Sequence, residues 1–283
     1  MKSLLAIINQ PKNLKKYVLY AISLAQELKT DLHFLHIMVP ENIPIGVNGA
    51  TGMAAASALE YTHEQAKDTE RKTMQYIKEY TDVIPIDISV NYHFDKGALP
   101  LVAEEYVQKE KSDIVLMEEA TDGKSWIHTS ATMEVLFQVN CPVWVAPADS
   151  LFVVPKRIVY ATDFKEEDLK TLSQLVALTQ TMKPEITALH FTNDASFEEK
   201  VKITGFSEMV QQKIDYTNIT IKLLSDKEHH NMAQSLNDYP IDKQTNLIVM
   251  LKSNRGFFDR MFKPDPAKVI IEKVHLPVLV FHE

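Results

Sequence analysis

Residues 246–266 read NLIVMLKSNRGFFDRMFKPDP, and this stretch decides the fold. It opens with the apolar run 247–250, continues into a polar turn and then returns to helical spacing of its apolar residues. A short apolar run bounded by polar residues is typical of a strand that is covered on both faces of a parallel sheet. In open α/β folds, ligands bind in the crevice beyond the carboxyl ends of such strands. The stretch therefore predicts an α/β sheet with a ligand crevice at this point.

The chain carries the same arrangement twice. An earlier, degraded copy of the opening stretch begins at Asp113. Residues 157–163 (RIVYATD) repeat the character of residues 3–9 (SLLAIIN), and residues 186–190 (ITALH) echo residues 32–36 (LHFLH) at the same offset. A repeat that keeps the order and type of its elements indicates duplicated domains.

We therefore predict domain 1 at residues 1–147 and domain 2 at residues 156–283, joined by a short linker. Later elements repeat at a smaller offset, so domain 1 carries extra residues between its second and fourth strands. The Gly/Ala-rich stretch 40–59 is the natural place for them, and we expect it to form a loop that leads into a long helix.

Hydrophobic spacing predicts alternating strands and helices along domain 1. Continuous apolar runs indicate buried strands, and apolar residues three and four apart indicate helices that cross over between parallel strands. The expected strands are 4–8, 32–38, 86–94, 114–117 and 143–146, and the expected helices are 14–28, 58–80, 101–109 and 131–139.

The composition limits the class of protein. With 45% hydrophobic and 24% charged residues, the chain resembles a globular protein. Its formal charge of −8 argues against nucleic-acid binding, which requires a basic face. No apolar run approaches the roughly 20 residues of a membrane span, and we expect the short N-terminal run to be a buried strand rather than a signal peptide. Cys141 is the only cysteine, so we expect a packed thiol, no disulfide and a cytoplasmic location.

Several features occur in both halves in one order. The first strands end at Asn9 and Asp163, and the second strands carry a Leu-His pair at His36 and His190. The fourth strands end in methionine, as IVLM and LIVM, and the closing strands follow proline, as CPVWV and LPVLV. In these features each half resembles the universal stress protein family.

The resemblance implies a specific fold and assembly. It implies two tandem doubly wound, parallel five-stranded sheets of strand order 3-2-1-4-5, of the adenine nucleotide alpha hydrolase-like type. It also implies that the closing strands pair with each other, so that the tandem chain forms an internal pseudo-dimer. This pairing is physically reasonable, because two apolar edge strands would otherwise lie unpaired. The resemblance leaves open whether the chain pairs further into a homodimer.

Nucleotide-binding members of the family carry the pattern Gly-x2-Gly-x9-Gly-Ser/Thr after the fourth strand. Glycines let the backbone approach phosphates, and the Ser/Thr stands at a helix start, which favours anions. In domain 1, Thr129 and Ser130 occupy the Gly-Ser place, but Gly123 is the one loop glycine and lies out of place. Glu118 begins the loop with a negative charge. Ser130 could also serve simply as the helix N-cap.

In domain 2 the loop has the family length without the family residues. Leu251 stands at the first glycine place, Pro264-Asp265 stands at the Gly-Ser place, and Gly256 is the only glycine. Lys252 and Arg255 could hold an anion by their side chains. A solvated basic face is the alternative interpretation.

Asp163 is the leading candidate for a ligand contact. It follows the first strand of domain 2, beside the fourth, at the switch point of this strand order. In the family an acidic residue here lines the nucleotide pocket, with Thr162 next to it; Asn9 is the uncharged counterpart in domain 1. The alternative role for Asp163 is the N-cap of the helix that begins near Glu166.

These observations favour a stress-response binding or regulatory module with degenerate nucleotide loops and weak or no ATP binding. The alternative is a residual binder of ATP or another adenine nucleotide through domain 2, and a nucleotide hydrolase ranks last. No Ser-His-Asp order or nucleophile elbow appears, so we predict no enzymatic activity. His36 and His190 are expected to be structural, and the sequence predicts no metal site.

Overall fold

A computed structural model describes residues 3–38, 51–119, 130–192, 196–225, 244–252 and 276–283. The elements of the first half are β1 (Ser3–Ile8), α1 (Leu14–Leu28), β2 (Asp31–Met38), α2 (Thr51–Thr81), β3 (Val90–Lys96), α3 (Leu99–Lys109), β4 (Ile114–Glu118), α4 (Ser130–Gln138) and β5 (Val143–Ala146). Those of the second half are β6 (Arg157–Ala161), α5 (Glu166–Thr179), β7 (Glu185–Thr192), α6 (Phe197–Lys213), β8 (Ile219–Ser225), β9 (Leu247–Lys252) and β10 (Val278–His282).

All ten of these strands form one sheet in the order β3-β2-β1-β4-β5-β10-β9-β6-β7-β8. Each half therefore has the predicted order 3-2-1-4-5, and its internal pairs are parallel. The halves join through the antiparallel pair β5–β10, in which Leu279 lies opposite Trp144. The predicted fold and the predicted pairing of closing strands are both confirmed.

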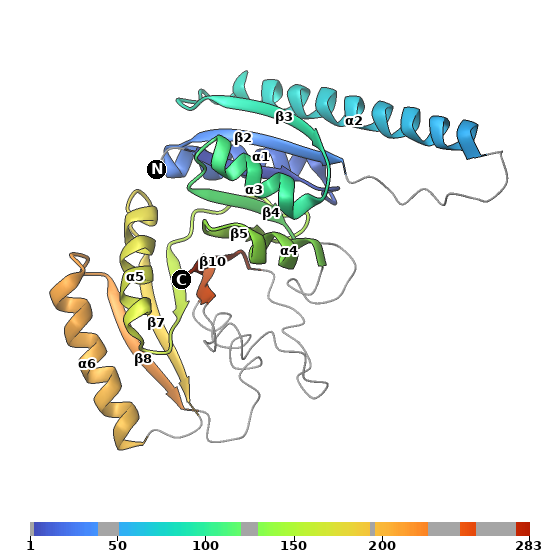
Figure 1. The fold of residues 1–283 in the computed structure, drawn as a ribbon. Coiled ribbons are helices and arrows are strands. Elements are labelled where there is room, and N and C mark those ends of the chain that lie inside the picture. Colours follow the sequence, from blue (N-terminus) through green and yellow to red (C-terminus); the bar gives the residue numbers. More distant parts are fainter. Residues whose placement is uncertain (1–2, 39–50, 120–129, 193–195, 226–243, 253–275) are drawn as a thin grey trace.

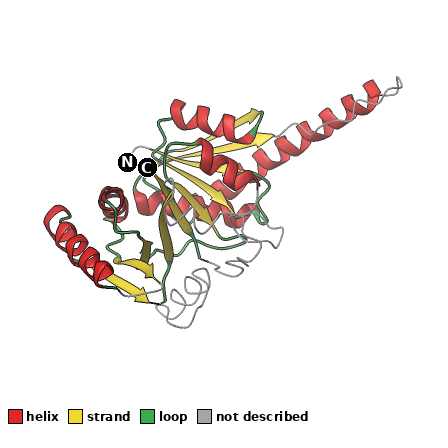
Figure 2. Ribbon diagram, turned by 60° about the horizontal axis from the view of Figure 1, so that its bottom comes forward, coloured by secondary structure: helices red, strands yellow, loops and turns green. Residues whose placement is uncertain are grey.

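Helices cover the sheet on both faces (Figures 1 and 2). In the first half, α1 and α2 pack together over one face, and α3 and α4 pack over the other. In the second half, α5 and α6 contribute to the same core as α1. Strand side chains alternate between the two faces, so Phe34 of β2 joins the first core and Leu35 joins the second.

Local sequence explains where α1 begins and ends. Asn13 is its N-cap, with a side chain that accepts a hydrogen bond from the Lys16 N–H at 3.2 Å. Lys29 ends the helix in a left-handed conformation, and the backbone N–H of this residue bonds back to the last turn. The bounds of α1 match the prediction from hydrophobic spacing.

Among the predicted boundaries that differ from the structure, three have a clear physical reason. The helix α2 begins at Thr51, inside the stretch predicted as a loop, because its alanines favour a helix and outweigh Gly52. The strand β3 begins at Val90 rather than residue 86, because Ile86 and Ile88 pack on the core without joining β2. The strand β9 continues to Lys252, past the methionine at which the polar turn was expected, because it pairs with β10 as far as His282.

None of the described helices is long and apolar enough to cross a membrane. The domain boundaries at residues 147 and 156 stay a prediction, although β5 and β6 lie on the expected sides of them.

Candidate functional site

The candidate site lies where β6 and β9 end at the switch point of the second half. Of the predicted ligand contacts there, the structure describes Thr162 and Asp163 after β6 and Lys252 at the end of β9. In the first half it places Asn9 after β1 and Ser130 at the start of α4. Four predicted contacts lie outside the described residues: Gly123, Thr129, Arg255 and Gly256.

Asp163 lies beside a buried histidine. Its side chain is 9% exposed, and its Oδ1 is 3.9 Å from Nδ1 of His190. The same Nδ1 is 2.7 Å from the carbonyl oxygen of Thr162, whereas Nε2 is 3.3 Å from Oε2 of Glu199 on α6. His190 thus links the end of β6 to α6 and stands between two carboxylates.

Glu199 belongs to the same group of side chains as Asp163 and His190, and two further contacts hold it in place. It also pairs with Lys202 at 2.7 Å, and this hydrogen bond is the main cause that lowers the pKa of Glu199, with His190 adding to it. Ser196 caps α6 by accepting the Glu199 N–H at 3.3 Å. The Lys202 ammonium group therefore offsets the charge of Glu199.

Asp168, rather than Asp163, accepts the backbone donors at the start of α5. Its carboxylate accepts the N–H of Asp163 at 3.1 Å and the N–H of Lys165, the N-cap residue, at 3.0 Å. It also accepts the hydroxyl of Tyr160 at 2.5 Å. The alternative role of Asp163 as the N-cap was thus wrong, because Asp168 reaches back from inside the helix.

Phe164 packs next to these groups. Its backbone is left-handed, with φ of 58°, which is uncommon for a residue other than glycine. The conformation is held by its N–H, which donates to Oγ1 of Thr162 at 2.9 Å. The ring lies 4.8 Å from the His190 ring and 5.1 Å from the Phe206 ring, measured between centroids. Aromatic side chains therefore pack beside Asp163.

The first half uses a carboxylate in a related way. Glu118, the last residue of β4, accepts the N–H of Lys12 at 2.7 Å and the N–H of Asp149 at 3.2 Å. Burial raises the pKa of Glu118, and the two backbone hydrogen bonds oppose this effect. The hydroxyl of Tyr17 bridges the adjacent strands by donating toward the carbonyl oxygens of Ile7 and Leu116.

Lys252 points toward the first half. Its Nζ donates to the carbonyl oxygen of Leu136 at 2.9 Å and lies 4.2 Å from the ring centroid of Phe137. Burial lowers the pKa of Lys252. His282 of β10 reaches the same carbonyl oxygen with Nε2 at 2.7 Å. Lys252 thus joins the two halves, and its predicted role with Arg255 in holding an anion stays untested.

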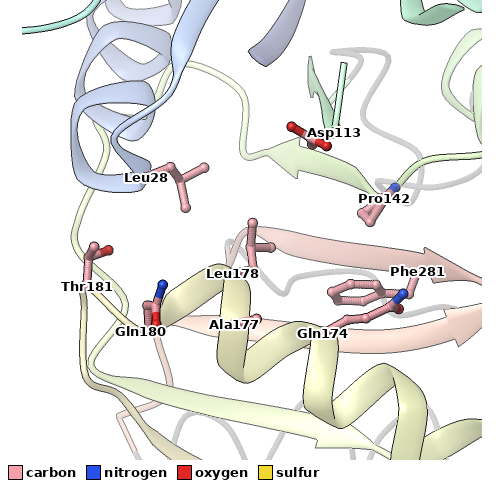
Figure 3. Close-up of a pocket in the computed structure, with 9 residues that line it drawn as sticks. All are labelled: Leu28, Asp113, Pro142, Gln174, Ala177, Leu178, Gln180, Thr181 and Phe281. Atoms are coloured by element: carbon pink, nitrogen blue, oxygen red, sulfur yellow. The ribbon is translucent and has the colours of Figure 1, made fainter. Parts of the chain in front are cut away.

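A separate cavity of about 350 Å³ lies between the halves (Figure 3). Leu28 approaches it from the end of α1, Leu178 from α5 and Phe281 from β10. Beside it, the hydroxyl of Thr181 donates to the carbonyl oxygen of Glu27 at 2.7 Å. None of the predicted ligand contacts that the structure describes lines this cavity.

Comparison with known proteins gives the family. Residues 155–282 match the model of the Universal stress protein family. Residues 155–282 therefore form a domain of the universal stress protein family. No curated protein sequence matches the chain.

Solved structures show the universal stress protein fold over the whole chain. A universal stress protein from Archaeoglobus fulgidus DSM 4304 has a TM-score of 0.68 at 14% identity, covering 99% of this chain and 96% of that one. A protein of unknown function from Pseudomonas aeruginosa PAO1 has a TM-score of 0.58 at 16% identity, covering 99% and 92%. A putative universal stress protein from P. aeruginosa UCBPP-PA14 has a TM-score of 0.58 at 14% identity, with the same coverage. Both halves therefore have the family fold.

Sequence reasoning missed Glu199, Asp168 and the acceptor role of Glu118. One signal for Glu199 was available, because Ser196 and Glu199 form the Ser-x-x-Glu pattern that starts a helix. That pattern places Glu199 one turn into the helix after the strand of His190. The hydrogen bonds of Asp168 and Glu118 had no comparable signal, since they depend on how loops fold back.

Proposed function

We propose that this tandem universal stress protein is a stress-response binding or regulatory module that binds adenine nucleotides weakly or not at all. One observation carries the proposal. In each half, a carboxylate of the chain itself accepts backbone N–H groups beside the crevice: Glu118 in the first half and Asp168 in the second.

These contacts oppose the binding of a phosphate. Backbone N–H groups near a helix start are the donors that anions use. A phosphate that used the donors held by Glu118 or Asp168 would have to displace that carboxylate, and one that bound beside them would meet a like charge. The loops after β4 and β9 also lack the glycine pattern in their sequences. We therefore expect no catalytic turnover of nucleotides either.

One observation favours the second candidate, an adenine-nucleotide binder through domain 2. Asp163 lies at the switch point with its carboxylate 3.9 Å from His190, where the family has a pocket-lining acid. A nucleotide could contact Asp163 through its base and ribose and leave the donors held by Asp168 untouched.

Calorimetry and thermal unfolding separate the two candidates. If the first candidate is right, the protein should show no heat of binding with millimolar ATP and Mg²⁺. Its melting temperature should not rise either, because any ligand of the folded state must stabilise that state. The second candidate gains support if ATP binds one per chain and Asp163→Ala abolishes the binding. Asp215→Ala, an exposed carboxylate on the same domain, is the matched control.

The stress role requires a cellular test. A strain that lacks the gene should survive a stress less well than its parent. If the module works without nucleotide, wild-type protein and Asp163→Ala should restore survival equally. Failure of the variant alone, with normal protein levels, would favour the nucleotide binder.

A further inference from the structure

Two histidines and one glutamate meet at the outer part of the first half. His33 lies on β2, His93 lies on the edge strand β3, and Glu110 follows the last residue of α3. Their ligand atoms all lie within 4.8 Å of one another. His33 is near the amino-terminal end of β2, whereas the candidate nucleotide crevice lies beyond the carboxyl ends of the central strands. The cluster is therefore separate from that crevice.

The spacing of the ligand atoms suits a metal ion. Nδ1 of His33 is 3.0 Å from Nε2 of His93 and 3.5 Å from Oε2 of Glu110. Nε2 of His93 is 4.0 Å from Oε1 of Glu110. A tetrahedral zinc ion with Zn–N bonds of about 2.0–2.1 Å holds two ligand atoms about 3.3–3.4 Å apart. The three observed separations bracket this value, so small side-chain movements would complete the site.

The fold holds the three side chains in place. His33 shares its face of β2 with the core residue Leu35, and Leu35 lies opposite His93 in the parallel pair β2–β3. The hydroxyl of Ser3 donates to the carbonyl oxygen of Glu110 at 3.1 Å, which fixes the end of α3 over the sheet. The cluster thus bridges two strands and a helix.

The three side chains are largely shielded from solvent. The side chains of His33, Glu110 and His93 are 13%, 20% and 23% exposed. The ring of Tyr106 packs on His93 with centroids 5.3 Å apart, and Lys109 lies over the Tyr106 ring. Burial is the main cause that lowers the pKa of His93, and Glu110 opposes it. A neutral imidazole is the form that binds metal.

We propose that His33, His93 and Glu110 form a binding site for a divalent transition-metal ion, with Zn²⁺ as the best fit. Imidazole ligands select zinc and its neighbours over Mg²⁺ and Ca²⁺, which prefer oxygen. Two histidines and one glutamate leave a fourth position for water or another ligand. Binding replaces the contact between the two imidazoles and ties the edge strand β3 to β2 and α3.

Titration of the full chain, freed of metal with a chelator, tests the site. ZnCl₂ should bind with one tight site per chain by calorimetry, and Co²⁺ should give the visible absorption bands of a tetrahedral ion. His33→Gln, His93→Gln and Glu110→Gln should each weaken binding about tenfold or more. The matched control is His36→Gln, on the same strand and bonded to Tyr92, which should bind as the wild type does.

A double variant excludes a second source of zinc binding. His229 and His230 are adjacent in the sequence and are the other histidine pair that zinc would use. The change His229→Gln/His230→Gln should retain the tight site, because that site is formed by His33, His93 and Glu110. Circular dichroism of each metal-free variant shows whether it folds. If a histidine variant does not fold, the zinc affinity of Glu110→Gln, a change at the end of a helix, tests the site instead. The proposal is overturned if the wild type binds no Zn²⁺ tightly, if Glu110→Gln binds equally well, or if His36→Gln loses as much affinity.

Discussion

The ammonium group of Lys252 donates a hydrogen bond to the carbonyl oxygen of Leu136 at 2.9 Å, which joins the end of β9 to the last turn of α4. The last carbonyl groups of a helix have no partner within it, and they attract cations. His282 shares the same carbonyl oxygen, so two side chains of the second half converge on one atom of the first. The contact adds to the pairing of β5 with β10 in holding the halves together.

Replacing Lys252 by methionine should destabilise the protein by about 1 kcal/mol, the usual net worth of such a hydrogen bond. Methionine keeps most of the apolar stem, so the change removes only the ammonium group, with its hydrogen bond to Leu136 and its contact with the Phe137 ring. Urea unfolding measures the effect. Lys222→Met, at an exposed position of the edge strand β8, should stay within about 0.5 kcal/mol of the wild type. Equal effects of the two changes would show that the Leu136 contact contributes nothing.

Tyr20→Phe should cost more, about 1–3 kcal/mol, because it leaves a buried donor without its acceptor. Nε1 of Trp144 donates to the Tyr20 hydroxyl at 2.8 Å, and both side chains are buried. Trp144 also lies opposite Leu279 in the strand pair that joins the halves. Urea unfolding followed by tryptophan fluorescence reports on this region. The control is Tyr76→Phe, which should change the free energy of unfolding by less than about 0.5 kcal/mol. The ring of Tyr76 lies under the Lys15 ammonium group, and phenylalanine keeps that ring.

The fold could be predicted from the sequence because its signals are local and repeated. Continuous apolar runs located β1 and β6, helical spacing gave the bounds of α1, and the order of elements fixed the sheet. The two closing strands could be paired because each would otherwise expose an apolar edge. The start of α2 could not be found, because glycines within an alanine-rich stretch send opposing signals.

The candidate site was predictable only in part. The position of Asp163 follows from the end of a strand at the switch point, and that of His190 follows from the matching strand. How these residues meet their partners depends on loops and on the angle of α6, although the Ser-x-x-Glu pattern places Glu199 in the first turn of that helix. The same holds for His33 and His93, which meet on a diagonal: His33 lies opposite Asn91, two residues before His93. Only the register of β2 and β3 reveals it.

Stability should fall as the pH drops below neutrality, and His36 should account for part of the loss. Burial lowers the pKa of His36 below its ordinary value of 6.5. The unfolded chain then takes up a proton before the folded chain does, so stability is complete above pH 6.5 and declines as the pH falls toward the folded pKa. His36→Gln should make this decline shallower in urea unfolding between about pH 7 and pH 5. An unchanged slope would show that His36 does not contribute to the loss of stability at low pH.

The final prediction links stability to the proposed absence of phosphate binding. Asp168→Ala removes the acceptor of the Asp163 and Lys165 N–H groups and of the Tyr160 hydroxyl, so it should cost about 2–4 kcal/mol. It also frees those N–H groups at the start of α5 for an anion. Inorganic phosphate should therefore raise the melting temperature of Asp168→Ala more than that of the wild type, with chloride at equal ionic strength as the reference. Glu166→Ala, exposed in the same turn, should respond as the wild type does. If phosphate stabilises wild-type protein and Asp168→Ala equally, the Asp168 carboxylate does not block anions and does not oppose nucleotide binding in the second half.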